Sequence, residues 1–141
     1  MLRGIPTIIS PELMKMMMLM GHGDELLLAD TNFPSCSHAK KIIMANGNNI
    51  PELLDAILKF FPLDKYVKNP VVLMKAIPED NIKHTIWETY KEIIKKYDES
   101  AINFEYMERF DFYERAKKAF CVVATSEKTL YANIILKKGI I

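Results

Sequence analysis

The chain has 141 residues, of which 50% are hydrophobic and 26% are charged. This is the size of a single domain, 1–141, with enough apolar side chains for a core, and the composition excludes a mostly disordered chain. The nineteen basic and eighteen acidic residues nearly cancel, so no overall field draws in nucleic acid or an anionic membrane, and we expect a small or neutral partner.

The first predicted element is a helix from Pro11 to Met20. Ser10 supplies an oxygen that can cap free amides, Pro11 has a ring already near helical φ, and Glu12 places a negative charge at the positive end of the helix dipole. The side chains from 13 to 20 are apolar nearly all round, apart from Lys15. We therefore expect more than one face of this helix to be covered by protein.

A histidine between two glycines follows this helix. Gly21 and Gly23 give His22 a flexible backbone and no bulky neighbour, which indicates a presented imidazole. The apolar run 25–29 predicts a buried strand, and Asp30 follows at its carboxyl end, where open α/β sheets collect ligand-binding groups. His22 and Asp30 are thus the first candidates for chemistry. The alternative is that the glycines only make a turn, with His22 solvated and Asp30 capping the next segment.

Asn32-Phe33-Pro34 predicts a loop near the candidate site. After this loop, apolar strands alternate with helical patterns along the rest of the chain. Strands are predicted over 41–45, 71–76, 103–107, 120–125 and 130–137, and helices over 51–61, 82–97 and 112–119. This order predicts an α/β fold: a single three-layer domain with a largely parallel sheet and helices on both faces. The sequence contains no Gly-rich phosphate loop after a strand and no GxSxG elbow, which disfavours nucleotide and acyl-serine chemistry.

The cysteines and the remaining histidines give little sign of a site. Cys36-Ser37-His38 would supply half of a zinc site, but no second pair stands at ligand spacing, so we expect no metal. His84 is expected on the surface at the start of its helix. Cys36 and Cys121 stand far apart without a CxxC neighbour, and we see no secretory leader, so we expect a reduced, cytoplasmic protein. No apolar run approaches the ~20 residues of a membrane span.

Several motifs in a fixed order cover nearly the whole chain. They are Met1-Leu2 through Ser10-Pro11-Glu12-Leu13, Met20-Gly21-His22-Gly23-Asp24-Glu25, Ala29-Asp30 with Asn32-Phe33-Pro34, Phe61-Pro62-Leu63-Asp64, Arg109-Phe110 with Phe112-Tyr113-Glu114-Arg115-Ala116, and Tyr131-Ala132-Asn133-Ile134-Ile135-Leu136-Lys137-Lys138-Gly139. Taken together, they resemble the fucose mutarotase and ribose pyranase family of sugar-anomer enzymes.

The resemblance implies a set of functional residues and an assembly. It implies that His22 is the acid/base residue, and that sugar-binding residues surround it, namely Asp30, Arg109, Tyr131 and Asn133. Tyr131 either only binds the sugar or also relays a proton. The resemblance further implies a homo-oligomer, a ring-like decamer, with sugar sites close to the subunit contacts. The apolar helix predicted over 11–20 gives an independent reason to expect an assembly.

One segment separates the two branches of this family. Fucose mutarotases carry an arginine where Arg109 stands, followed by an aromatic-rich segment like 112–116, whereas ribose pyranases have a histidine-containing segment there. The chain therefore resembles the fucose branch, although Ala132 and Ser126 stand where that branch has glycines. The implied activity is interconversion of the α and β anomers of L-fucose. The alternatives are a D-ribose pyranase and a non-catalytic sugar-binding protein of the same fold.

The chemistry of this reaction agrees with the motifs that are present and with those that are missing. Opening a pyranose ring requires a proton to leave the anomeric hydroxyl while the ring oxygen gains one. Histidine suits this role because an unperturbed pKa of about 6.5 lets it give and take a proton near neutral pH. The reaction needs no metal, nucleotide or covalent nucleophile, so we expect a monosaccharide substrate and no cofactor.

Overall fold

The structure is a computed structural model that describes residues 2–80, 83 and 85–141. Its α-helices are α1 (Pro11–Leu19), α2 (Ser35–His38), α3 (Ile50–Leu58), α4 (Thr85–Lys95) and α5 (Arg109–Lys118). Its strands are β1 (Glu25–Ala29), β2 (Ile42–Ala45), β3 (Val71–Met74), β4 (Glu105–Met107), β5 (Cys121–Thr125) and β6 (Ile134–Lys137). Two short 3-10 helices, η1 (Pro78–Asp80) and η2 (Glu99–Ile102), precede α4 and β4.

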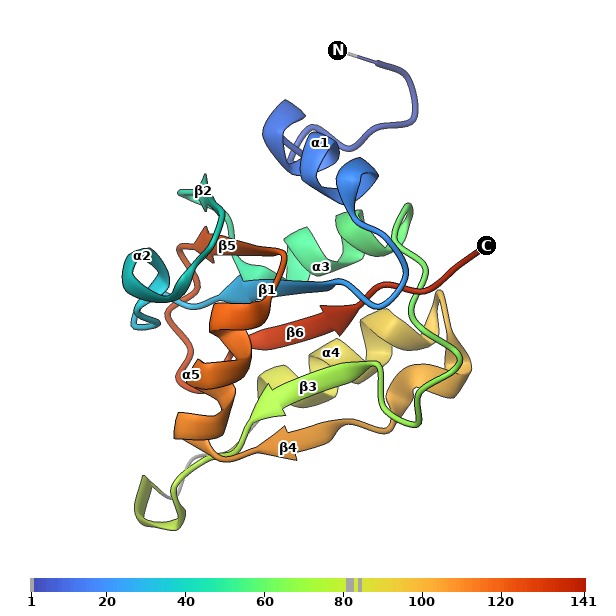
Figure 1. The fold of residues 1–141 in the computed structure, drawn as a ribbon. Coiled ribbons are helices and arrows are strands. Elements are labelled where there is room, and N and C mark those ends of the chain that lie inside the picture. The colour runs from blue at the N-terminus through green and yellow to red at the C-terminus, as the bar shows by residue number, and fades with distance from the viewer. Residues whose placement is uncertain (1, 81–82, 84) are drawn as a thin grey trace.

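The strands form one sheet in the order β2-β5-β1-β6-β3-β4 (Figure 1). Within the described residues, β6 runs antiparallel to both of its neighbours, while every other pairing is parallel. The carboxyl ends of the five parallel strands therefore meet at one edge of the sheet, together with the start of β6. The predicted α/β fold with a largely parallel sheet is confirmed.

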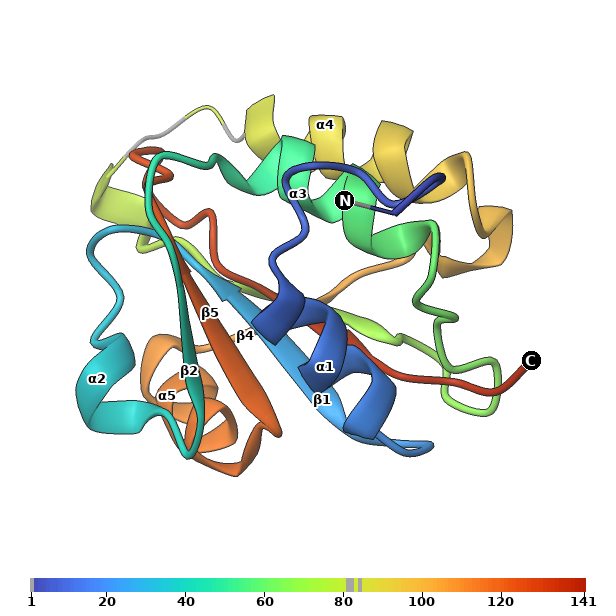
Figure 2. The same ribbon diagram turned by 90° about the horizontal axis from the view of Figure 1, so that it is seen from above.

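Helices cover both faces of this sheet, as a view along it shows (Figure 2). Successive residues of β1 point to opposite faces, as expected of a strand. Leu26 and Leu28 belong to the larger core cluster, with side chains of α1, α3 and α4. Leu27 and Ala29 belong to a second cluster, which contains Phe112 of α5. The three layers follow from this alternation, because each face of a fully buried strand needs its own apolar cover.

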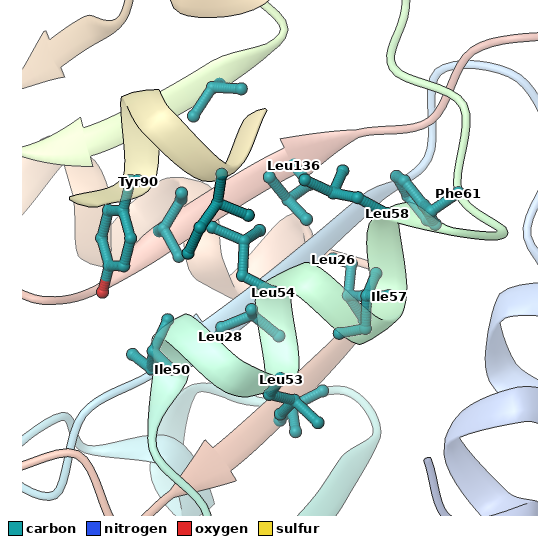
Figure 3. Packing of buried hydrophobic residues seen from close by; sticks show 14 of the residues in the cluster. Leu26, Leu28, Ile50, Leu53, Leu54, Ile57, Leu58, Phe61, Tyr90 and Leu136 are labelled. Atoms are coloured by element: carbon teal, nitrogen blue, oxygen red, sulfur yellow. The ribbon is translucent and has the colours of Figure 1, made fainter. Parts of the chain in front are cut away.

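The helix predicted over 51–61 is present as α3, and its apolar side chains lie on the sheet (Figure 3). Leu54 and Ile57 are fully buried in the cluster that contains Leu26, Leu28 and Leu136. Burial of each such side chain stabilises the fold by roughly 1.5–3 kcal/mol. In the same layer of helices, Tyr90 of α4 is also fully buried, and its hydroxyl donates to the carbonyl oxygen of Ala132 at 2.7 Å. This bond ties α4 to the segment that leads into β6.

The boundaries differ from the predictions where local geometry overrides periodicity. β6 begins at Ile134 and not at 130, because Tyr131 has φ +57°, a left-handed conformation that no strand accepts. α5 begins at Arg109, three residues before the predicted 112, with a backbone bond from Phe112 N–H to the Glu108 carbonyl. The one-turn helices α2, η1 and η2 were not predicted, since a single turn shows no periodicity. Residues 82 and 84 of the predicted 82–97 helix lie outside the described residues, so the prediction for His84 has no structural counterpart.

The predicted helix over 11–20 is present as α1, and the Ser10 hydroxyl oxygen accepts the Leu13 N–H at 3.1 Å. Leu13 and Met17 are its buried residues, whereas Met18 is 79% exposed. The expected cover on more than one face is therefore not supplied by the chain itself. An apolar groove of about 750 Å³ lies between α1 and the N-terminal segment. Within the described residues, no helix is both long and apolar enough to cross a membrane.

Candidate active site

A cavity of about 160 Å³ opens at the edge of the sheet where the parallel strands end, and we call it the binding cavity. It is lined by Asp30, Asn32, Phe33, Met74, Asp80, Arg109, Tyr113, Leu130, Tyr131 and Asn133. Topology explains this gathering. Asp30 follows β1, Arg109 comes soon after β4, and the antiparallel course of β6 brings its start to the same edge. All the residues predicted to bind sugar thus line one cavity.

Asp30 and Asn133 form a buried pair at the floor of the binding cavity. Their exposed fractions are 5% and 4%. The Asp30 N–H donates to Asn133 Oδ1 at 2.8 Å, and Asn133 Nδ2 donates to Asp30 Oδ2 at 2.9 Å. The other carboxylate oxygen accepts the N–H groups of Asn32 and Phe33, each at 3.0 Å. Burial raises the pKa of Asp30, although these hydrogen bonds oppose the shift. Together, the four hydrogen bonds hold the two side chains in fixed positions in the binding cavity.

Tyr131 is held from three directions. Its hydroxyl donates to the Asp80 carboxylate and accepts the Ile77 N–H at 3.4 Å. Its carbonyl oxygen accepts the Trp87 indole N–H at 2.9 Å. The hydrogen bond to Asp80, together with burial, raises the pKa of Tyr131, so its phenol stays protonated at neutral pH. Left-handed backbone in a residue other than glycine is strained, and such strain persists where the surroundings fix it.

Arg109 supplies the positive charge of the binding cavity. It is the first residue of α5, and its guanidinium lies over the Phe110 ring at 4.8 Å from the centroid. Among the described residues no carboxylate lies within ion-pair distance of Arg109, so its planar fork of donors is available to a ligand. Phe33 and Tyr113, with ring centroids 5.5 Å apart, add an aromatic wall. Charged donors beside an aromatic wall suit a molecule with hydroxyl groups and a C–H face.

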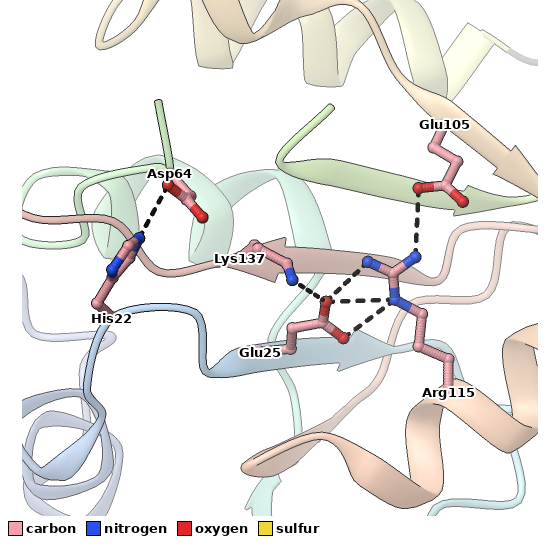
Figure 4. Close-up of polar contacts among 6 residues, drawn as sticks. All are labelled: His22, Glu25, Asp64, Glu105, Arg115 and Lys137. Carbon is pink, nitrogen blue, oxygen red and sulfur yellow. Dashed lines mark hydrogen bonds and ion pairs between the residues drawn. The ribbon is translucent and has the colours of Figure 1, made fainter. Parts of the chain in front are cut away.

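His22 lies at the other end of β1, away from the binding cavity. Its Nε2 is 3.1 Å from Asp64 Oδ1, with 45% of the His22 side chain exposed and 4% of the Asp64 side chain (Figure 4). The five residues of β1 separate it from Asp30 by roughly 16 Å at about 3.3 Å per residue. One copy of the chain therefore does not bring His22 to the other predicted site residues.

A cluster of charged side chains connects β1, β4, β6 and α5 (Figure 4). Glu25, at the start of β1, accepts three hydrogen bonds from Arg115 of α5, the shortest at 2.7 Å, and lies 3.3 Å from Lys137 Nζ. Arg115 also pairs with Glu105 of β4 at 3.2 Å. Burial opposes ionisation of Glu25, but Arg115 and Lys137 outweigh it and lower the pKa of that carboxyl. α5 and Arg109 are thus anchored on the sheet.

Sequence reasoning did not single out Met74 or Asp80, and it named Asp64 only within the motif Phe61-Pro62-Leu63-Asp64, without a role. Met74 is the last residue of β3 and Asp80 is the last residue of η1, and none of the motifs found in the sequence includes either of them. Cys36 is exposed and His38 Nδ1 lies 2.8 Å from the Ser37 hydroxyl, and in the described part of the chain no three His, Cys, Asp or Glu side chains gather as a metal site.

Comparison with known proteins gives this arrangement a family. The family model described as the RbsD / FucU transport protein family matches residues 3–141. A curated fucose mutarotase of Danio rerio is 51% identical over 146 residues, covering 99% of this chain and 94% of that protein. The crystal structure of the fucose mutarotase in complex with L-fucose from Streptococcus pneumoniae has a TM-score of 0.93 and 51% identity, with 99% of each chain covered.

A more distant structure shares the fold alone. Bacillus subtilis RbsD complexed with D-ribose superposes with a TM-score of 0.72 at 19% identity, over 94% of this chain and 95% of that one. The family model and the curated relative both cover nearly all of the sequence, including every residue that lines the binding cavity. The chain is therefore a member of the RbsD / FucU family.

Proposed function

We propose that this chain is an isomerase that interconverts the α and β anomers of free L-fucose. The observation that carries the proposal is the 51% identity, over 99% of both chains, to a fucose mutarotase crystallised with L-fucose. The polar cavity lined by Arg109 and floored by Asp30 and Asn133 supports it. Arg109 also argues against a ribose pyranase, because the resemblance implies that ribose pyranases have a histidine-containing segment at this position.

Both cysteines are free thiols, and we propose the reducing cytoplasm as the compartment of this protein.

The proposed reaction is a sequence of proton transfers. The His22 imidazole takes the proton of the anomeric hydroxyl while the bond from the anomeric carbon to the ring oxygen breaks and an aldehyde forms. The ring oxygen takes a proton from the imidazolium, the aldehyde carbon rotates, and the reverse steps close the ring in the other configuration. Tyr131 donates its one hydroxyl proton to Asp80, so its role here is to bind the sugar, with its oxygen accepting a hydrogen bond from a sugar hydroxyl. Asp30, Asn133 and Arg109 hold the hydroxyl groups.

His22 must then come from a second copy of the chain. The length of β1 keeps His22 from the binding cavity of its own copy, so the catalytic and sugar-binding residues would meet across a contact between copies. His22 borders an apolar groove of about 400 Å³ formed with Met14, Met17 and Met18 of α1. An apolar helix face that its own chain leaves open is typical of an interface. We propose a homo-oligomer, a ring-like decamer, with the sugar site at the contact.

Exchange between sugar anomers tests the activity. In an NMR saturation-transfer experiment with L-fucose, D-ribose and D-galactose in parallel, we expect added protein to speed exchange of fucose most. His22→Ala should lower that rate by about 10²- to 10⁴-fold, the usual contribution of a general acid/base. Faster exchange of ribose than of fucose would assign the chain to the ribose activity. Binding without faster exchange of any sugar would identify a non-catalytic sugar-binding protein.

Mixed assemblies test the shared site. His22→Ala and Asn133→Ala chains are each expected to be inactive, but co-expression lets an intact cavity of one chain meet an intact histidine of the other. At equal amounts, about one quarter of the sites would regain both halves. A mixture as inactive as either variant alone, formed from chains shown to co-assemble, would contradict the shared site.

Sedimentation velocity supplies the subunit number, and a single 16.3 kDa species with full activity would refute the assembly.

A further inference from the structure

Helix α4 holds the backbone of residues 131 and 132 from outside the binding cavity. The Trp87 indole N–H donates to the Tyr131 carbonyl oxygen at 2.9 Å, and the Tyr90 hydroxyl donates to the Ala132 carbonyl oxygen at 2.7 Å. Trp87 and Tyr90 are three residues apart in α4, so they lie on the same face of that helix. Neither side chain is among those that line the binding cavity. Two successive carbonyl groups beside the cavity are thus bonded to one face of α4.

The contact between Trp87 and Tyr131 joins the two faces of the sheet. Trp87 packs against the larger core cluster, which contains Tyr90 and side chains of α3. Tyr131 packs against the second cluster, which contains Phe112 of α5, and it lines the binding cavity. With φ +57°, Tyr131 directs its ring toward the cavity while its carbonyl group is bonded from α4. The direction of the ring therefore depends on this backbone conformation.

The indole N–H is a well-placed support for a strained residue. A left-handed backbone in tyrosine is unfavourable and persists only where the surroundings hold it. The Tyr131 hydroxyl contacts Asp80 and the Ile77 N–H, but both of these residues are exposed, so water competes for the same groups. Trp87 is half-buried, and its ring lies 5.2 Å from the Tyr106 ring. Its hydrogen bond is therefore the better protected of these contacts.

We propose that Trp87 is a positioning residue for sugar binding, which acts by holding Tyr131 in its left-handed conformation. Without the indole N–H, the backbone at residue 131 can return to negative φ, which carries the phenol away from its place in the cavity. The sugar then loses its hydrogen bond to the Tyr131 oxygen. Because this bond is present in the bound sugar and in the transition state alike, its loss weakens binding and leaves proton transfer by His22 unchanged. The inference rests on the proposed function, because it concerns how the proposed site holds fucose.

A purely structural anchor for α4 is the competing explanation, and the composition of the chain allows a sharp test of it. Trp87 is the only tryptophan in the sequence, so growth of a tryptophan auxotroph on benzothienylalanine replaces this residue alone. That analogue has the shape of tryptophan with a sulfur atom in place of the N–H, so it removes the donor and keeps the packing of the ring. A ring-fluorinated tryptophan keeps the N–H and is the control for the replacement itself. Trp87→Phe is the genetic version of the same change.

The kinetics of fucose anomer exchange in the intact assembly measure the effect. We expect the benzothienyl protein and Trp87→Phe to raise KM for fucose about three- to tenfold, the contribution of one neutral hydrogen bond, with kcat within about twofold of wild type. The fluorinated protein should match wild type. Tyr97→Phe should also match it, since the Tyr97 hydroxyl lies 3.1 Å from the Asp55 carbonyl oxygen and is remote from the cavity. In the Tyr131→Phe background, Trp87→Phe should raise KM no further.

Coupling between two sites is reciprocal, so fucose should protect the indole proton. A single tryptophan gives a single indole N–H resonance in protein labelled with nitrogen-15, which makes its exchange with water measurable without further assignment. We expect saturating fucose to slow this exchange by the same factor, about three- to tenfold, because the sugar favours the conformation in which Trp87 is bonded to Tyr131. In Tyr131→Phe, fucose should leave the rate unchanged. A wild-type rate that is equal with and without fucose would contradict the coupling.

The outcomes separate this inference from the proposed function. If wild type speeds fucose exchange and the benzothienyl protein has the KM of wild type, the positioning role is refuted and the proposed function stands. The same rise in KM with and without the Tyr131 hydroxyl refutes the role as well, because Trp87 would then act independently of it. If wild type speeds the exchange of no sugar, the proposed function fails, whereas calorimetric titration with fucose still tests whether Trp87 sets the affinity.

Discussion

Exchanging the two side chains at the floor of the binding cavity tests whether their hydrogen bonds are as directional as the structure indicates. Asp30 uses both carboxyl oxygens as acceptors, and Asn133 Nδ2 donates to one of them. In Asp30→Asn, an oxygen is still needed for the two backbone N–H groups, so the new amide nitrogen would face the amide nitrogen of Asn133. Neither a flip of residue 30 nor a flip of residue 133 removes this conflict, because Asn133 Oδ1 already accepts the residue 30 N–H.

The double variant Asp30→Asn with Asn133→Asp restores both hydrogen bonds between residues 30 and 133. The amide at 30 would donate to the carboxylate at 133, whose other oxygen still accepts the residue 30 N–H. A lost hydrogen bond to a charged group costs roughly 1.5–3 kcal/mol, and a stranded buried donor adds to this, so Asp30→Asn should lose about 2–4 kcal/mol. The double variant should lie within about 1 kcal/mol of wild type, a strong coupling for two residues in contact.

Urea unfolding at pH 7 measures this coupling, with all variants at one protomer concentration because assembly shifts apparent stability. The second single variant, Asn133→Asp, should also be destabilised, since two buried carboxyls would face each other. A double variant that loses as much as the two single variants together would refute the reasoning, because it would mean that burial of charge, and not the match of donors with acceptors, sets the stability of the pair.

The remaining predictions concern specificity, packing and pH. Arg109→His should lower fucose anomer exchange by more than about tenfold with little loss of folding stability, because imidazole lacks the planar fork, and an equal fucose rate would remove arginine from the specificity argument. Gly139→Ala should cost about 1–3 kcal/mol or more in urea unfolding because its Cβ would meet the Leu63 carbonyl at 2.4 Å, whereas Gly21→Ala, with its nearest atom at 3.8 Å, should cost far less. Glu25→Gln should lower the free energy of unfolding at pH 7, where the carboxylate is ionised in both states. Because the folded-state pKa is lowered, this contribution is present above the ordinary value of 4.5 and disappears as the pH falls through the lowered pKa, so a difference between wild type and variant that persists unchanged at pH 2 would contradict the ion-pair origin.

The sequence predicted elements wherever a cap or a period was present. Ser10-Pro11-Glu12 predicted the start of α1, and the helical pattern from Pro51 predicted α3. Periodicity did not predict the one-turn helix α2 or the late start of β6, because a single turn and a single left-handed residue leave no repeating pattern.

The site was predictable residue by residue but not as an assembled whole. Asp30 could be placed at an edge of the sheet because it follows a strand, whereas Asp80 and Met74 reach the binding cavity through long-range topology that has no local signal. The predicted strand between His22 and Asp30 already implied their separation, since five extended residues cannot bring both ends together. The apolar character of α1 likewise could not indicate whether its cover comes from the same chain or from another copy.

The antiparallel course of β6 has a geometric consequence. The residues that lead into β6 include Tyr131 and Asn133 beside the binding cavity, and the end of β6, through residues 137–139, holds the segments that carry His22 and Asp64. The length of β6 therefore sets the distance between the two halves of the proposed active site. An insertion or deletion in it would change that length by about 3.3 Å per residue and turn the following side chains to the opposite face of the sheet. In a closed ring of identical copies, the same displacement would occur at every contact between copies. An insertion or deletion of one residue in β6 would therefore prevent the proposed ring from closing.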